Sequence, residues 1–151
     1  MNRIPCQCRS RGQAALTRAQ LLAVINAGKT PRDRALLAVV LGAGLRPQEL
    51  ARLEWGDVKW EGVKRHPDGM MYVRGTKSIE SDRTIPLTAL VRDALRPYWE
   101  SVGERLDGTV FLTREGKPYE TGDGASYYRA MLRGAADRAG LVGTRVTPYT
   151  C

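Results

Sequence analysis

Residues 30–53 read TPRDRALLAVVLGAGLRPQELARL, and the order of apolar residues, glycines and charges in this stretch decides the fold. Thr30 before Pro31 is typical of a helix start. Threonine can cap a helix, and proline is tolerated in the first turn because a backbone N–H there would have no partner within the helix. Residues 35–41 are apolar on every side, which predicts a central, buried helix. The glycines that follow end this helix, and residues 46–53 resume a helical pattern.

The sequence around this stretch predicts further helices and one hairpin. A capping-box pattern at Thr17 and a cap at Thr88 each indicate a helix, and another is expected over residues 125–139. Residues 70–74 and 84–87 favour strands, and the polar segment between them predicts a β-hairpin. The fold class is therefore α+β, mainly helical with a small antiparallel sheet, without the βαβα alternation of nucleotide-binding folds.

The charge of the chain points to a polyanionic partner. Its 151 residues carry 24 Lys and Arg against 16 Asp and Glu, a formal net charge of +8. Six of the basic residues and no acidic one lie in residues 1–32, so most of the excess belongs to the N-terminal part. We expect residues 1–16 to form a basic flexible arm or linker remnant, and residues 17–151 to form one folded domain.

Several classes of protein are disfavoured by the composition. The apolar run between Arg34 and Arg46 is too short to cross a bilayer and no leader opens the chain, so a cytoplasmic protein without membrane contact is expected. His66 is the single histidine and lies in an evident turn, so no multi-histidine metal centre is available. The three cysteines have neither the number nor the spacing of a zinc or disulfide framework. We expect no metal and no cofactor.

One motif carries candidate chemistry. Arg46 stands where a loop gives way to a helix, and Glu49 follows three positions later. At this spacing the carboxylate lies on the same side of the turn as the Arg46 backbone, so it can hold the guanidinium in one orientation, which suits a phosphate. The alternative is a solvated ion pair of little energetic weight, the usual role of an isolated Arg-x-x-Glu.

Four blocks, in order along the chain, resemble the tyrosine recombinases, the phage-integrase family of site-specific DNA recombinases. They are residues 44–50 (GLRPQEL), the pair 73–77 (VRGTK) and 83–87 (RTIPL), residues 110–111 with 129–141, and residues 146–151 (VTPYTC). The first is similar to the family's first active-site block, the second to its β-hairpin, and the last to the lead-in to its second block. The match spans residues 16–151 and implies the catalytic-domain fold of these DNA breaking and rejoining enzymes.

The resemblance assigns roles to individual residues. Arg46 would be the first of two arginines that grip the scissile phosphate, with Glu49 as its supporting acid. Lys77 would donate a proton to the departing 5′ oxygen, a reaction that needs no metal. Tyr149 stands in the place usually held by a histidine. The alternative for Lys77 is a charge at a hairpin tip that only favours solubility.

The sequence also departs from the family pattern. It stops one residue before the expected second arginine, and the nucleophilic tyrosine, which in the family lies further downstream, is missing. The family's N-terminal helical clamp is absent as well. The sequence therefore predicts a partial catalytic domain, incomplete at its C-terminus, that does not cleave DNA alone, because residues acting as a unit lose nearly everything when one is removed.

Double-stranded DNA is the expected partner. Candidate contacts to backbone phosphates are Arg74, Lys77, Arg83, Arg129 and Arg133. The alternative for the last two, four residues apart, is that they only solvate a helix face. Besides a recombinase fragment, the sequence leaves open a DNA-binding accessory that pairs with a full-length recombinase, and a basic RNA-binding or structural protein.

Incompleteness would also affect folding. If further helices normally cover the central helix, its apolar surface, formed by Leu36, Leu37, Val39 and Val40, would be exposed here. Exposed apolar patches favour association. We therefore expect a marginally stable or self-associating protein.

Overall fold

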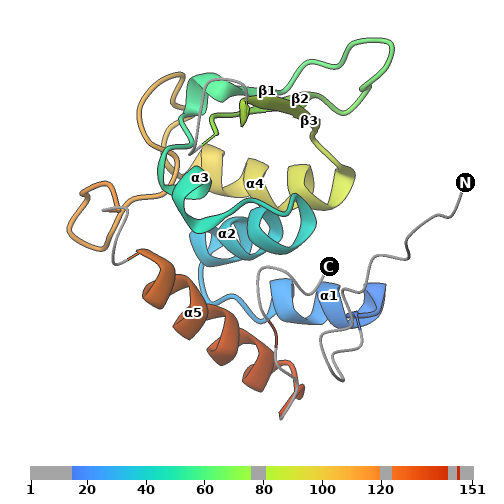
Figure 1. Ribbon diagram of the computed structural model, residues 1–151, viewed down its shortest axis with the longest axis vertical. Helices are drawn as coiled ribbons and strands as arrows, with labels where there is room; N and C mark the ends of the chain where they lie inside the picture. Colours follow the sequence, from blue (N-terminus) through green and yellow to red (C-terminus); the bar gives the residue numbers. More distant parts are fainter. Residues whose placement is uncertain (1–14, 76–80, 120–123, 143–145, 147–151) are drawn as a thin grey trace, which may run out of the picture.

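The computed structural model describes residues 15–75, 81–119, 124–142 and 146. These form helices around a central helix, with a small sheet on one side (Figure 1). The order is α1 (Arg18–Asn26), α2 (Pro31–Gly42), α3 (Pro47–Ala51), the 3₁₀ turn η1 (Trp55–Asp57), β1 (Val58–Lys59), β2 (Met70–Val73), β3 (Arg83–Pro86), α4 (Ala89–Ser101) and α5 (Gly124–Arg138). The predicted class, mainly helical with a small antiparallel sheet, is confirmed.

The helix starts follow the predicted capping chemistry. The Thr17 hydroxyl accepts the Gln20 amide at 3.2 Å, and the Gln20 side chain accepts the Thr17 amide at 2.9 Å, which completes the capping box. At the start of α2 the Thr30 hydroxyl accepts the amide of Asp33 at 3.1 Å. Local sequence therefore sets where α1 and α2 begin.

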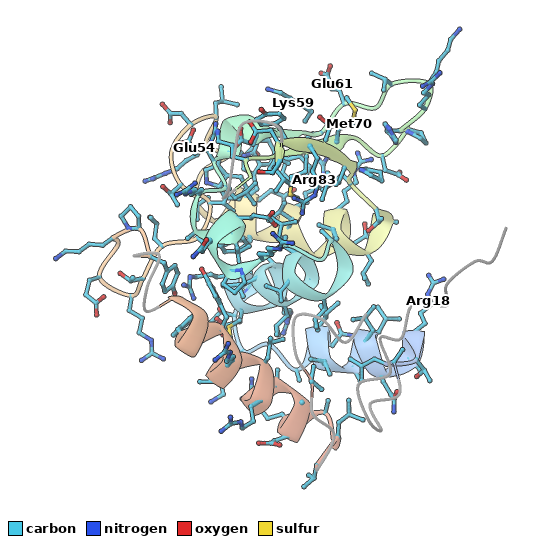
Figure 2. All side chains as sticks on the ribbon, in the orientation of Figure 1. Arg18, Glu54, Lys59, Glu61, Met70 and Arg83 are labelled. Carbon is cyan, nitrogen blue, oxygen red and sulfur yellow. The ribbon has the colours of Figure 1, made fainter. Side chains whose placement is uncertain are left out.

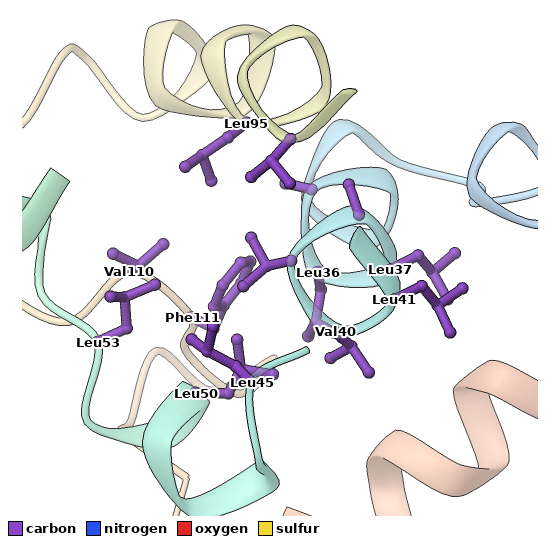
Figure 3. Close-up of a cluster of buried hydrophobic side chains, with 14 of the residues drawn as sticks. Leu36, Leu37, Val40, Leu41, Leu45, Leu50, Leu53, Leu95, Val110 and Phe111 are labelled. Carbon is purple, nitrogen blue, oxygen red and sulfur yellow. The ribbon is translucent and has the colours of Figure 1, made fainter. Parts of the chain in front are cut away.

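The core is built around α2, which packs against α1, α3 and α4 of the same chain. Figure 3 shows Leu36 on the side of α2 toward Phe111 and toward Leu95 of α4, and Leu37 and Leu41 on the opposite side of the helix. The expectation of an exposed apolar surface on α2 is wrong, because Leu36, Leu37, Val39 and Val40 are each at most 1% exposed. These four side chains therefore offer no exposed apolar surface for self-association.

The sheet has the order β1, β2, β3 with antiparallel neighbours. The predicted hairpin is confirmed as the pair β2 and β3, in which Met71 lies opposite Ile85 and Val73 opposite Arg83. Met71 and Val73 are buried and alternate with exposed Tyr72, so one face of β2 packs on the core.

The segment after α4 is fixed to the core by hydrogen bonds. The amide of Val110 donates to the carbonyl of Leu53 at 2.8 Å, and the Val110 carbonyl accepts the Tyr98 hydroxyl at 2.8 Å. Phe111 is fully buried and stacks on the Tyr98 ring.

In the part of the chain that the structure describes, no helix is long and apolar enough to span a membrane.

Candidate functional site

The first turn of α3 presents Arg46. Gly44, with φ of 65°, turns the chain after α2, and Leu45 is buried. Arg46 then caps α3 in an extended conformation, with Pro47 in the first turn of the helix. The Arg46 side chain is exposed, and its guanidinium makes no hydrogen bond or ion pair with the described residues. The guanidinium is therefore available to an external anion.

Glu49 is a buried carboxylate that holds two elements together. It is 3% exposed. Its Oε2 accepts the backbone amide of Arg46 at 2.9 Å, while Oε1 and Oε2 accept Nη1 and Nη2 of Arg83 at 2.7 and 3.0 Å. The expected clamp on the Arg46 guanidinium is thus corrected. Glu49 holds the Arg46 backbone, and the guanidinium it binds is that of Arg83, because β3 brings that residue within reach.

The electrostatics of Glu49 agree with this geometry. Burial opposes ionisation and by itself would raise the pKa of the Glu49 carboxyl. The hydrogen bonds from Arg83 and from the Arg46 amide, together with the charges of both guanidinium groups, outweigh burial and lower this pKa below its ordinary value. The same contact raises the pKa of Arg83. Glu49 is therefore an ionised, paired carboxylate at neutral pH.

Arg74 forms a second tie between the hairpin and the α3 region. Its Nη2 lies 2.9 Å from Oδ1 of Asp57 and 3.3 Å from Oε2 of Glu54, and its Nη1 donates to the carbonyl of Arg52 at 3.2 Å. Asp57 is buried, so this pair is also partly shielded from water. These internal bonds give Arg74 a structural role, which the sequence did not predict.

Asp82 closes the neck of the hairpin loop. Its Oδ1 accepts the Gly75 amide at 2.7 Å and its Oδ2 accepts the Tyr72 hydroxyl at 2.6 Å. The Tyr72 hydrogen bond, followed by that of the Gly75 amide, lowers the pKa of Asp82. Lys77 and Tyr149 themselves lie outside the described residues. Sequence reasoning missed this role of Asp82. The position of an acidic residue directly before the second strand of the hairpin could have indicated it.

The remaining predicted contacts lie on α5. Arg129 and Arg133 are exposed and make no hydrogen bond or ion pair within the described part of the chain. Arg83 and Arg74 are thus joined to carboxylates, whereas Arg46, Arg129 and Arg133 have no carboxylate partner among the residues that the structure describes. No cluster of three or more metal-ligating His, Cys, Asp or Glu side chains occurs in the described ranges.

A further arginine that sequence reasoning missed lies at the start of α2. Arg32 donates to the hydroxyls of Tyr119 and Tyr127 and to the carbonyl of Leu112. The rings of Tyr119, Tyr127 and Tyr128 pack against one another in tilted and edge-to-face arrangements. Burial, the largest cause, raises the pKa of Tyr119 to about 12. This cluster fixes the chain before α5 against α2.

Comparison with known proteins identifies the family. The model of the phage integrase family matches residues 15–150, and the chain belongs to this family of site-specific recombinases. No curated protein matches the chain at a significant level.

Solved structures share the fold. A crystal structure of XerA recombinase is similar with a TM-score of 0.72 at 21% identity, covering 93% of this chain and 48% of the XerA chain. A lambda integrase dimer bound to a COC′ core site matches with a TM-score of 0.51 at 21% identity over 85% of this chain and 36% of the integrase. A lambda integrase tetramer bound to a Holliday junction gives 0.51 at 22% identity. The chain therefore has the recombinase catalytic-domain fold and spans about half the length of XerA.

Proposed function

We propose that the chain acts in site-specific DNA recombination, as the part of a tyrosine-recombinase catalytic domain that grips the scissile phosphate with Arg46. The observation that carries this proposal is the contrast around Glu49. Its buried carboxylate anchors the backbone of Arg46, while the Arg46 guanidinium is exposed and has no partner among the described residues. An arginine whose backbone is fixed and whose side chain is uncommitted suits bidentate binding of a phosphate.

The proposed chemistry assigns one task to each residue. Arg46 stabilises the charge that develops on the non-bridging oxygens of the phosphate. Lys77, carried by the loop between β2 and β3, donates a proton to the departing 5′ oxygen. The second arginine and the tyrosine nucleophile of the family have no match within these 151 residues. We therefore propose that this chain binds DNA and does not cleave it unaided.

The proposed partners are double-stranded DNA and other recombinase subunits. The lambda integrase neighbours are described as a dimer on a core site and a tetramer on a Holliday junction, which supports DNA binding and self-association for this fold. Lys77, Arg129 and Arg133 are the proposed contacts to backbone phosphates beside Arg46. Pairing with a full-length recombinase would supply the missing groups.

Salt-dependent binding to a labelled duplex tests the proposal. Arg46→Ala should weaken binding and reduce the slope of log K against log salt by about 0.9, the value for one lost phosphate contact. Arg114→Ala is the matched control, because Arg114 is also exposed and lies outside the candidate site. Equal effects of the two substitutions would contradict the proposed role of Arg46. A covalent protein–DNA adduct formed by this chain alone would contradict the proposed lack of cleavage.

A further inference from the structure

We propose that Arg83 is a positioning residue, which acts through Glu49 to fix Arg46 relative to strand β3, and that it is not itself a DNA contact. This inference rests on the proposed function, because it gives Arg83 a part in the same phosphate site. It replaces the sequence-based expectation that Arg83 binds a backbone phosphate.

The geometry joins β3 to the start of α3 through one carboxylate. Arg83 is the first residue of β3, and Arg46 precedes the first turn of α3. Both oxygens of Glu49 are engaged by Arg83, and Oε2 also receives the Arg46 amide. Figure 2 shows Arg83 on the side of the sheet that faces the helices in this view. A displacement of β3 is therefore transmitted to the backbone of Arg46.

The burial of the pair explains why this link is firm. The Glu49 side chain is 2% exposed, whereas the Arg83 side chain is 40% exposed. A buried carboxylate that loses its partner is left with an unsatisfied charge, so Glu49 strongly favours the arrangement in which Arg83 reaches it. The two-armed guanidinium also fixes direction, which a single ammonium contact does not.

The hairpin has a second anchor on its other strand. Arg74 directly follows β2 and binds buried Asp57, and Asp82 joins Gly75 across the neck of the loop. Together with the bond between Arg83 and Glu49, these contacts hold both ends of the loop that carries Lys77. The root of the loop is therefore fixed to the segment that presents Arg46.

Arg83 keeps three of its five N–H donors, so a direct phosphate contact is chemically possible and the experiment must separate the two roles. Duplex binding is measured for wild type, Arg83→Gln, Arg46→Ala and the double variant. Positioning predicts that Arg83→Gln weakens binding by about tenfold, because the displaced Arg46 then loses about one charge-assisted hydrogen bond to the phosphate. It also predicts that Arg83→Gln adds less than twofold to Arg46→Ala. Additive losses, with the salt slope reduced by about 1.8 in the double variant, would overturn it.

Glu49→Gln gives a sharper contrast. This substitution makes the protein more positive by one charge and keeps an oxygen that can accept the Arg46 amide. If only charge mattered, DNA binding would be unchanged or tighter. Positioning predicts weaker binding, because the amide group cannot hold both arms of the Arg83 guanidinium as a carboxylate does. Unchanged or tighter binding would overturn the proposal.

Hydrogen exchange supplies a readout that needs no DNA. Arg83→Gln should speed exchange of the Arg46 amide at least tenfold, while the amide of Ala38 in the middle of α2 keeps its wild-type rate. Arg83→Lys, which keeps the charge and loses the two-armed contact, should do the same, and it serves if the glutamine variant does not fold. An unchanged Arg46 rate would overturn the proposal. If wild type fails to bind DNA, the proposed function fails, and the exchange rates still decide whether the link exists.

Discussion

Replacing Leu37 by alanine tests whether the described chain closes its own core. Leu37 lies in the middle of α2 and is fully buried. Burying a leucine side chain contributes about 1.5–3 kcal/mol, and the cavity left by truncation raises the cost of Leu→Ala to about 3–5 kcal/mol at a closed site. We therefore expect Leu37→Ala to lower the free energy of unfolding by at least about 3 kcal/mol, a large part of the roughly 5–15 kcal/mol of a typical domain.

Urea denaturation followed by circular dichroism measures this difference, at several protein concentrations so that association is detected. Leu106→Ala is the matched control, because it removes the same atoms from a side chain that is 81% exposed. It should change the free energy of unfolding by less than about 0.5 kcal/mol. If Leu37→Ala cost no more than Leu106→Ala, or if wild type unfolded without a cooperative transition, the conclusion that α1, α3 and α4 enclose α2 would be refuted.

Three further predictions each concern a single residue. Tyr98→Phe should cost about 1–2 kcal/mol in urea denaturation, because it leaves the buried carbonyl of Val110 without its donor; a neutral result would contradict that bond. Gly44→Ala should lower Tm by about 2–4 °C, since φ is 65° while open space surrounds the new methyl group, so the cost is conformational; an unchanged Tm would show that the turn differs. The pKa of Glu49 is lowered on folding, so its stabilising contribution is complete above the ordinary pKa of an unfolded glutamate and is lost as pH falls through the lower folded value. Unfolding free energies between pH 7 and pH 3 should therefore fall less steeply in Arg83→Gln, and equal slopes would contradict the pairing.

The sequence predicted the parts of the fold that depend on local chemistry. Helix starts at Thr17 and Thr30 follow from threonine hydroxyls that accept the backbone amide of the residue three positions later, and the β2–β3 hairpin follows from two strand-forming segments. The two-residue strand β1 has no periodicity of its own and exists because β2 pairs with it. The sequence also could not predict which elements bury the apolar side chains of α2, because this depends on the tertiary packing of helices that are separate in the sequence.

The candidate site divides in the same way. Arg46 and Glu49 are three residues apart, so their proximity was predictable, and the sequence located both. The partner of the Glu49 carboxylate was not, because Arg83 lies 34 positions further along the chain and reaches Glu49 through strand pairing. Residue type identified the candidates, and only the tertiary arrangement showed which arginine each carboxylate binds.

That arrangement changes what the basic residues of the site can do. An ion pair with a buried carboxylate adds little net stability compared with an apolar pair of the same shape, so stability alone gives little reason to bury Glu49. Glu49 instead fixes the relative position of two elements. It accepts three N–H groups, one from Arg46 and two from Arg83, and thereby ties β3 to the start of α3. Arg83 and Arg74 bind buried acids, whereas the Arg46 guanidinium has no partner among the described residues although its backbone amide is held by Glu49. A phosphate bound beside Arg46 would therefore meet an exposed guanidinium, whereas the guanidinium groups of Arg74 and Arg83 already bind carboxylates of the protein.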